Sequence, residues 1–87
     1  MDNKSKGKIK VKMYREKTWQ SVCVGTEENS ELFGVKIFTT DFKPTGETIS
    51  YHNRPYAVYY AQINGSYERF AMAEISNGVY EFLLYKY

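Results

Sequence analysis

The sequence is poor in the residues that build disulfides, metal sites and membrane spans. Its 87 residues include one cysteine, Cys23, and one histidine, His52, so a single chain cannot form an internal disulfide or a four-ligand zinc site from these residue types. No run approaches the ~20 apolar residues that cross a bilayer. The opening MDNKSKGKIKVK also lacks the apolar core of a secretory signal. We therefore expect a cytoplasmic, intracellular protein with no membrane partner.

Catalytic and cofactor-binding motifs are missing as well. The sequence contains no glycine-rich phosphate loop and no GxGxxG pattern. A nucleophile and base pair of Cys23 and His52 would need an orienting carboxylate, and a lone cysteine is more typical of a small buried side chain. The glutamates at 27, 28 and 31 are typical of a solvated helical turn. We therefore predict that the protein is not an enzyme and that it uses no cofactor and no metal.

Charge is distributed unevenly along the chain. Residues 1–17 carry seven basic and two acidic side chains, which gives 7 − 2 = +5, whereas residues 18–87 carry five basic and eight acidic ones, which gives 5 − 8 = −3. Aromatic residues make up 17% of the chain, and their large buried areas argue against general disorder. We expect a flexible basic tail over 1–7 and a single β-rich domain over 8–87.

A row of lysines is the charged feature with a regular spacing. Lys8, Lys10 and Lys12 alternate with apolar residues over 8–14, which predicts a half-buried strand with one basic face. Successive lysines on such a strand lie about 7 Å apart, which is close to the phosphate spacing along a nucleic-acid strand. The same row suits an acidic protein surface, or protects a sheet edge from aggregation. We name these lysines as candidate residues for binding an anionic partner.

The middle of the chain predicts short elements separated by turns. Residues 19–24 and 35–40 alternate as strands do, whereas 41–47 has the proline and glycine of a turn. Thr26 followed by two glutamates resembles a capped helix start, and the next glycine would end such a helix. We therefore predict one short helix near 27–33.

Two Asn-Gly pairs, at 64–65 and 77–78, organise the rest of the chain. Asn-Gly between apolar runs is the strongest short-range signal for a hairpin. The predicted strands here are 48–52, 56–63, 67–75 and 79–86. The alternative for the third strand is a helix at 67–76, because ERFAMAE is rich in helix formers and Asn-Gly also suits a helix end. The fold would then be α+β.

The strand at 56–63 is apolar on both faces, with Tyr56, Val58 and Tyr60 opposite Tyr59 and its neighbours. Such strands normally lie inside a sheet that is covered on both sides. A chain this small buries only about 60% of its unfolded surface, so it covers both faces by rolling its sheet or by pairing with a partner, including a second copy. The predicted fold class is all-β and mainly antiparallel, a small meander rolled into an open barrel or sandwich.

Eight of the nine tyrosines lie between 51 and 87. Such rings pack across strands, contact a protein partner or stack nucleobases. The residues that we predict to bind a protein partner are Arg54, Tyr56, Tyr59, Tyr60 and Tyr67. The predicted function is a noncatalytic binding protein that occupies a partner's surface, in the manner of viral or mobile-element accessory proteins that inhibit a host nuclease or defence system. The alternative is a single-stranded nucleic-acid-binding protein that uses the lysine row and tyrosine stacking.

Overall fold

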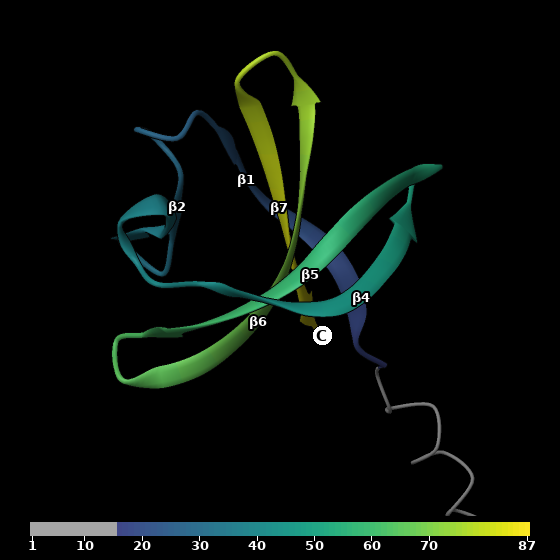
Figure 1. Cartoon of the computed structure of the whole chain (residues 1–87). Coiled ribbons are helices and arrows are strands. Elements are labelled where there is room, and N and C mark those ends of the chain that lie inside the picture. Colours follow the sequence, from purple (N-terminus) through teal and green to yellow (C-terminus); the bar gives the residue numbers. More distant parts are fainter. Residues whose placement is uncertain (1–15) are drawn as a thin grey trace, which may run out of the picture.

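Residues 16–87, the part of the chain that the computed structural model describes, form strands and one 3₁₀ turn (Figure 1). In chain order the elements are β1 (Thr18–Gly25), β2 (Glu31–Leu32), β3 (Val35–Lys36), the 3₁₀ turn η1 (Ile37–Thr39), β4 (Lys43–Tyr51), β5 (Arg54–Ile63), β6 (Ser66–Ser76) and β7 (Val79–Lys86). Five strands form one antiparallel sheet in the order β1-β7-β6-β5-β4, and β2 pairs with β3. The all-β prediction is confirmed. The sheet is not closed into a barrel, and β1 and β4 are its edges.

The second half of the chain forms the predicted antiparallel meander. Asn64 and Gly65 have φ angles of 53° and 84°, as a type I′ turn requires. At the second Asn-Gly pair only Gly78 has a positive φ, 77°, and the register shifts nearby, as in a hairpin with a bulge. The alternative helix at 67–76 is wrong, because β6 is hydrogen-bonded to β5 on one side and β7 on the other. These two ladders outweigh the helix propensity of ERFAMAE.

The helix predicted near 27–33 is also wrong. The amide of Asn29 donates to the carbonyl of Thr26 at 3.2 Å, and the hydroxyl of Ser30 donates to the same carbonyl. In a helix, this carbonyl would instead accept the backbone N–H of Ser30. Local side-chain bonds of this kind compete with helix formation. The chain therefore turns at 26–29 and continues into β2.

The strand predicted at 35–40 ends after β3 and continues as η1. Ile37 is completely buried there, and its amide donates to the carbonyl of Ser30 at 2.9 Å. The hydroxyl of Thr40 donates to the carbonyl of Ile37 at 2.7 Å. The turn brings Ile37 onto the sheet. Its burial there favours the 3₁₀ turn over the extended strand that the alternation predicted.

The turn predicted over 41–47 is largely part of β4. Pro44 pairs with Tyr59, and the register of β4 against β5 then shifts before Thr48. Gly46 lies in this irregular stretch with a φ of 88°. An edge strand tolerates a proline and a bulge because one side of its backbone needs no ladder bonds.

Apolar side chains pack on both faces of the five-stranded sheet. We call one face the covered face, because β2, β3 and η1 pack against it; its buried residues, counting those on the covering segment, are Leu32, Ile37, Ala61, Ile63, Phe70 and Phe82. We call the other the curled face; its buried residues are Tyr56, Val58, Ala71 and Leu83. Trp19 of β1 and Ile49 of β4 pack against this second cluster from the two edge strands. The prediction that β5 lies inside a sheet and is covered on both faces is confirmed.

Several sequence predictions lie outside the described residues. These are the basic tail over 1–7, the strand over 8–14 and the row of Lys8, Lys10 and Lys12. Within residues 16–87, no helix has the length and apolar character needed to cross a membrane.

Candidate protein-binding surfaces

The five residues predicted to bind a protein partner do not form one patch. Tyr56 is only 2% exposed and belongs to the core of the curled face. Tyr59 lies on the opposite face, stacked against Phe70 with ring centroids 5.9 Å apart. Arg54 is exposed at the start of β5. Only Tyr60 and Tyr67 are brought together at the surface.

Tyr56 is held in place by a polar contact inside the curled face. Its hydroxyl donates to Oε1 of Glu81 at 2.7 Å. Burial, together with this bond, raises the pKa of Tyr56 to about 12. Hydrogen bonds from Ser21 and then from Tyr56 lower the pKa of Glu81, because they stabilise the charged carboxylate. Tyr56 therefore serves the stability of the fold, which explains why it does not reach the surface.

The Tyr56→Phe variant is expected to be about 1 kcal/mol less stable at neutral pH, because it leaves Glu81 without one donor. The raised pKa of Tyr56 also predicts a pH effect. In the wild type, the stability due to this phenol is fully present below the unfolded pKa of 10.0 and is lost as pH rises through about 12. The variant should lose less stability over this range, as urea unfolding at several pH values would measure. An unchanged alkaline profile would contradict the role of the contact.

Tyr60 of β5 and Tyr67 of β6 form an exposed aromatic pair. Tyr60 pairs with Arg69 in the ladder, and Tyr67 pairs with Gln62, so the two rings are diagonal neighbours on one face. Their centroids lie 6.5 Å apart, and the residues are 39% and 75% exposed. A pocket of about 460 Å³ beside them is also lined by Thr40, Asp41, Lys43, Ala61 and Gln62. We call the two rings and this pocket the tyrosine surface.

Charges of both signs border the tyrosine surface. The ammonium of Lys43 donates to Oδ2 of Asp41 at 3.1 Å, and this bond raises the pKa of Lys43. Arg69 is the ladder partner of Tyr60, and its guanidinium contacts the carboxylate of Glu47. Such exposed ion pairs add little to stability. Protein–protein interfaces are typically enriched in aromatic side chains and bordered by a polar rim, and the tyrosine surface has this composition.

No family model, curated protein or solved structure matches this chain. Within residues 16–87 no three acidic, histidine or cysteine side chains cluster as metal ligands.

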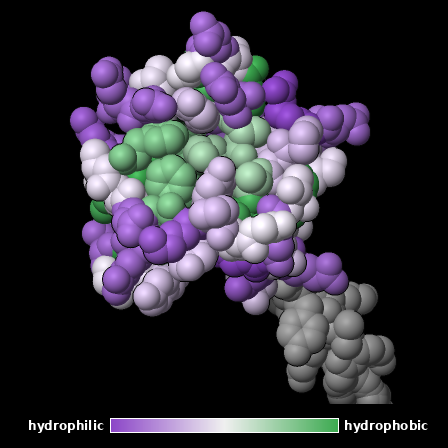
Figure 2. Space-filling model, in the orientation of Figure 1, coloured by the Kyte–Doolittle hydropathy of each residue, from purple (hydrophilic) through white to green (hydrophobic). Residues whose placement is uncertain are grey.

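The covered face carries a second set of rings, of which only Tyr59 was predicted from the sequence as a binding residue. Tyr80, Phe38, Phe42 and Tyr59 contact one another in this order, with centroid distances of 5.2, 5.6 and 5.2 Å. Each ring is half-buried. We call these four rings the aromatic row. In Figure 2 apolar side chains gather beside β2 and η1 and are bordered by hydrophilic ones.

The segment from η1 to β4 positions two rings of this row. Phe38 lies in η1 and Phe42 lies in the link to β4, whereas Tyr59 and Tyr80 come from sheet strands. The sequence assigned Phe42 to a polar turn and Phe38 to a strand. The signal that could have indicated a buried position is Phe42 itself, because a large apolar ring is unfavourable in an exposed turn such as DFKPTGE.

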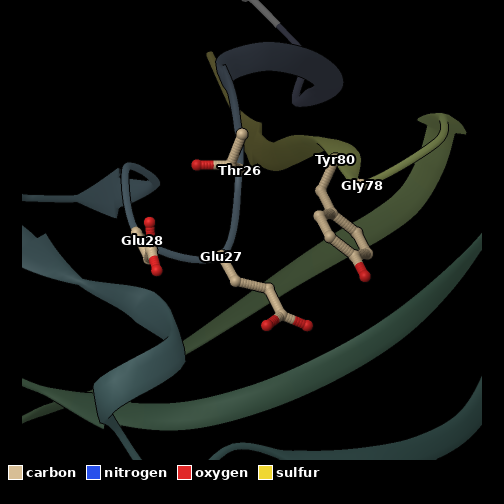
Figure 3. A pocket seen from close by; sticks show the side chains of 5 residues that line it. All are labelled: Thr26, Glu27, Glu28, Gly78 and Tyr80. Atoms are coloured by element: carbon tan, nitrogen blue, oxygen red, sulfur yellow. The ribbon is translucent and has the colours of Figure 1, made fainter.

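An acidic pocket adjoins the aromatic row. It holds about 340 Å³ and is lined by Thr26, Glu27, Glu28, Gly78 and Tyr80. Figure 3 shows Glu27, from the link between β1 and β2, and Tyr80, from β7, as walls of this pocket. Burial, followed by the carboxylates of Glu74 and Glu27, raises the pKa of Tyr80. Three carboxylates, those of Glu27, Glu28 and Glu74, therefore lie near Tyr80 at this end of the sheet.

Proposed function

We propose that this protein is a noncatalytic binding module that acts by occupying the surface of a protein partner through its tyrosine surface. The observation that carries this proposal is the pair of exposed rings on neighbouring strands, with Tyr67 75% exposed. Exposed tyrosines on a rigid hairpin are typical of binding hot spots, because they bury much area and lose little conformational freedom. A viral or mobile-element inhibitor of a host enzyme is one form that such a module takes.

The charges around the tyrosine surface favour a protein over a nucleic acid. Lys43 and Arg69 are each paired with a carboxylate, so the rim has no excess of positive charge. Phosphate binding depends on such an excess. The alternative function as a single-stranded nucleic-acid-binding protein depends instead on the lysine row, which lies outside the described residues.

Alanine at Tyr60 or Tyr67 is expected to weaken partner binding by more than about 1 kcal/mol each, which is at least fivefold in Kd. The partner would be captured from an extract of the native host with the full chain and its affinity then measured by calorimetry. Tyr87→Ala is the matched control, because Tyr87 is 62% exposed and does not line the tyrosine surface. Its affinity should equal that of the wild type.

Two outcomes would contradict the proposed function. The first is an affinity that none of the tyrosine variants changes while their unfolding curves stay normal. The second is tight binding of labelled single-stranded DNA or RNA that weakens steeply between low and physiological salt. That dependence is the signature of counterion release, and it would favour the nucleic-acid alternative.

A further inference from the structure

The aromatic row packs against the core of the covered face and is only partly buried. Phe70 and Phe82, on the same face, are completely buried, whereas all four rings of the row are half-buried. Burial is therefore complete at Phe70 and Phe82 beneath the covering segment, and partial where Phe38 and Phe42 of that segment meet Tyr59 and Tyr80 of the sheet. Among the described residues, the row leaves part of each ring open to a partner.

The acidic pocket determines which partner fits. Its carboxylates, Glu27 and Glu28, come from the link between β1 and β2, and none of the described residues that line it is basic. After burial, the carboxylates of Glu74 and Glu27 contribute to the raised pKa of Tyr80, so both lie close to its hydroxyl. Charge complementarity therefore favours a cationic side chain in the pocket.

Tyr80 joins the two features into one surface. Its ring lies 5.2 Å from Phe38 at the end of the aromatic row, and the same residue lines the pocket. A cationic side chain that enters the pocket therefore has its neighbouring residues over Phe38 and Phe42. Arginine fits this position well, because its planar guanidinium both pairs with carboxylates and stacks on an aromatic ring.

We propose that the aromatic row and the acidic pocket form a second binding surface, which accepts a partner's peptide segment that carries arginine or lysine next to apolar side chains. This inference is independent of the tyrosine surface. Tyr60 and Tyr67 line a different pocket, which shares no lining residue with this one. Variants can therefore separate the two sites.

The test is selection of a phage-displayed random peptide library on the full-length protein. The peptides that enrich should carry arginine or lysine beside leucine, isoleucine or an aromatic residue. A synthetic copy of an enriched peptide should bind the wild type at least fivefold more tightly than the double variant Glu27→Gln, Glu28→Gln, by fluorescence anisotropy. Both glutamates are exposed, so this variant should unfold like the wild type. On peptide addition, NMR signals of Tyr80 and Phe38 should shift.

The controls distinguish this surface from the tyrosine surface. Tyr67→Ala and Glu47→Gln should leave the affinity for the synthetic peptide unchanged. Enrichment of acidic or uncharged peptides would overturn the inference, as would equal affinity for the wild type and the double glutamine variant. Loss of binding in Tyr67→Ala would show that the peptide binds the tyrosine surface, and it would also overturn the inference. If no selected peptide binds the wild type more tightly than the double glutamine variant, the inference is likewise overturned.

Discussion

The Phe82→Ala variant is expected to lose about 3–5 kcal/mol of unfolding free energy, because truncation of a buried phenylalanine leaves a cavity. Phe82 is completely buried, and its ring packs 6.0 Å from Phe70 and 5.8 Å from Phe38. Native domains typically have only about 5–15 kcal/mol in total, and small ones have the least core. Urea denaturation followed by Trp19 fluorescence would measure the loss.

The matched control for Phe82→Ala is Tyr67→Ala. Tyr67 is 75% exposed, so its truncation should change the unfolding free energy by less than about 0.5 kcal/mol. The NMR signals of Phe38 give a second measurement, because its ring contacts both Phe82 and Tyr80. They should shift in Phe82→Ala and stay unchanged in Tyr67→Ala. A loss below about 1 kcal/mol in Phe82→Ala would contradict the core described here, since only an exposed or collapsible site is so tolerant.

The strands of the second half were predictable because their signals are local. The predicted strand at 79–86 coincides with β7, and the one at 67–75 lies within β6 (Ser66–Ser76). Each Asn-Gly pair sets its turn by the φ angles that its own residues tolerate. The alternation within β5 also placed Tyr56 and Tyr60 on one face, opposite Tyr59, and the two core clusters confirm that Tyr56 and Tyr59 lie on opposite faces.

The segment before β4 was not predictable because its conformation depends on distant contacts. Residues 27–33 carry a helix-start pattern, yet Leu32 is buried against sheet residues far along the chain. The same holds for Ile37, which the alternation assigned to a strand over 35–40. Burial on the sheet decides both conformations, and a local pattern contains no information about it.

The candidate sites were predictable only in part, for a related reason. Tyr56 and Tyr60 share a face of β5, but Tyr56 is buried and Tyr60 is 39% exposed. The difference arises because Tyr51 and Trp19, from the two edge strands, pack against the cluster around Tyr56. Alternation gives the face of a side chain, whereas the side chains that the edge strands contribute decide which end of that face is buried.

The Gly25→Ala variant is expected to lose about 3 kcal/mol of unfolding free energy, as overpacked sites do. A Cβ at this position would overlap the backbone carbonyl oxygen of Asn29 and would lie 3.1 Å from Oγ of Ser30. Backbone cannot move aside as a flexible side chain does. Ser30 is completely buried, and its carbonyl accepts the amide of Ile37 at 2.9 Å. A displacement of Asn29 and Ser30 should therefore weaken the hydrogen bond from the Ile37 amide and reduce the hydrogen-exchange protection of that amide.

Gly65→Ala is the control for Gly25→Ala, because it isolates backbone strain from steric overlap. Gly65 has a φ of 84° with no atom within 4 Å of its added Cβ, so alanine there should cost only about 1–2 kcal/mol for the left-handed conformation. The Ile37 amide should keep its protection in this control. Because Gly25 ends β1 and directly precedes the link that carries Glu27, its variant should bind the selected basic peptide more weakly, whereas Gly65→Ala should bind it normally. Equal stability losses and equal Ile37 protection in the two variants would contradict the close approach at Gly25.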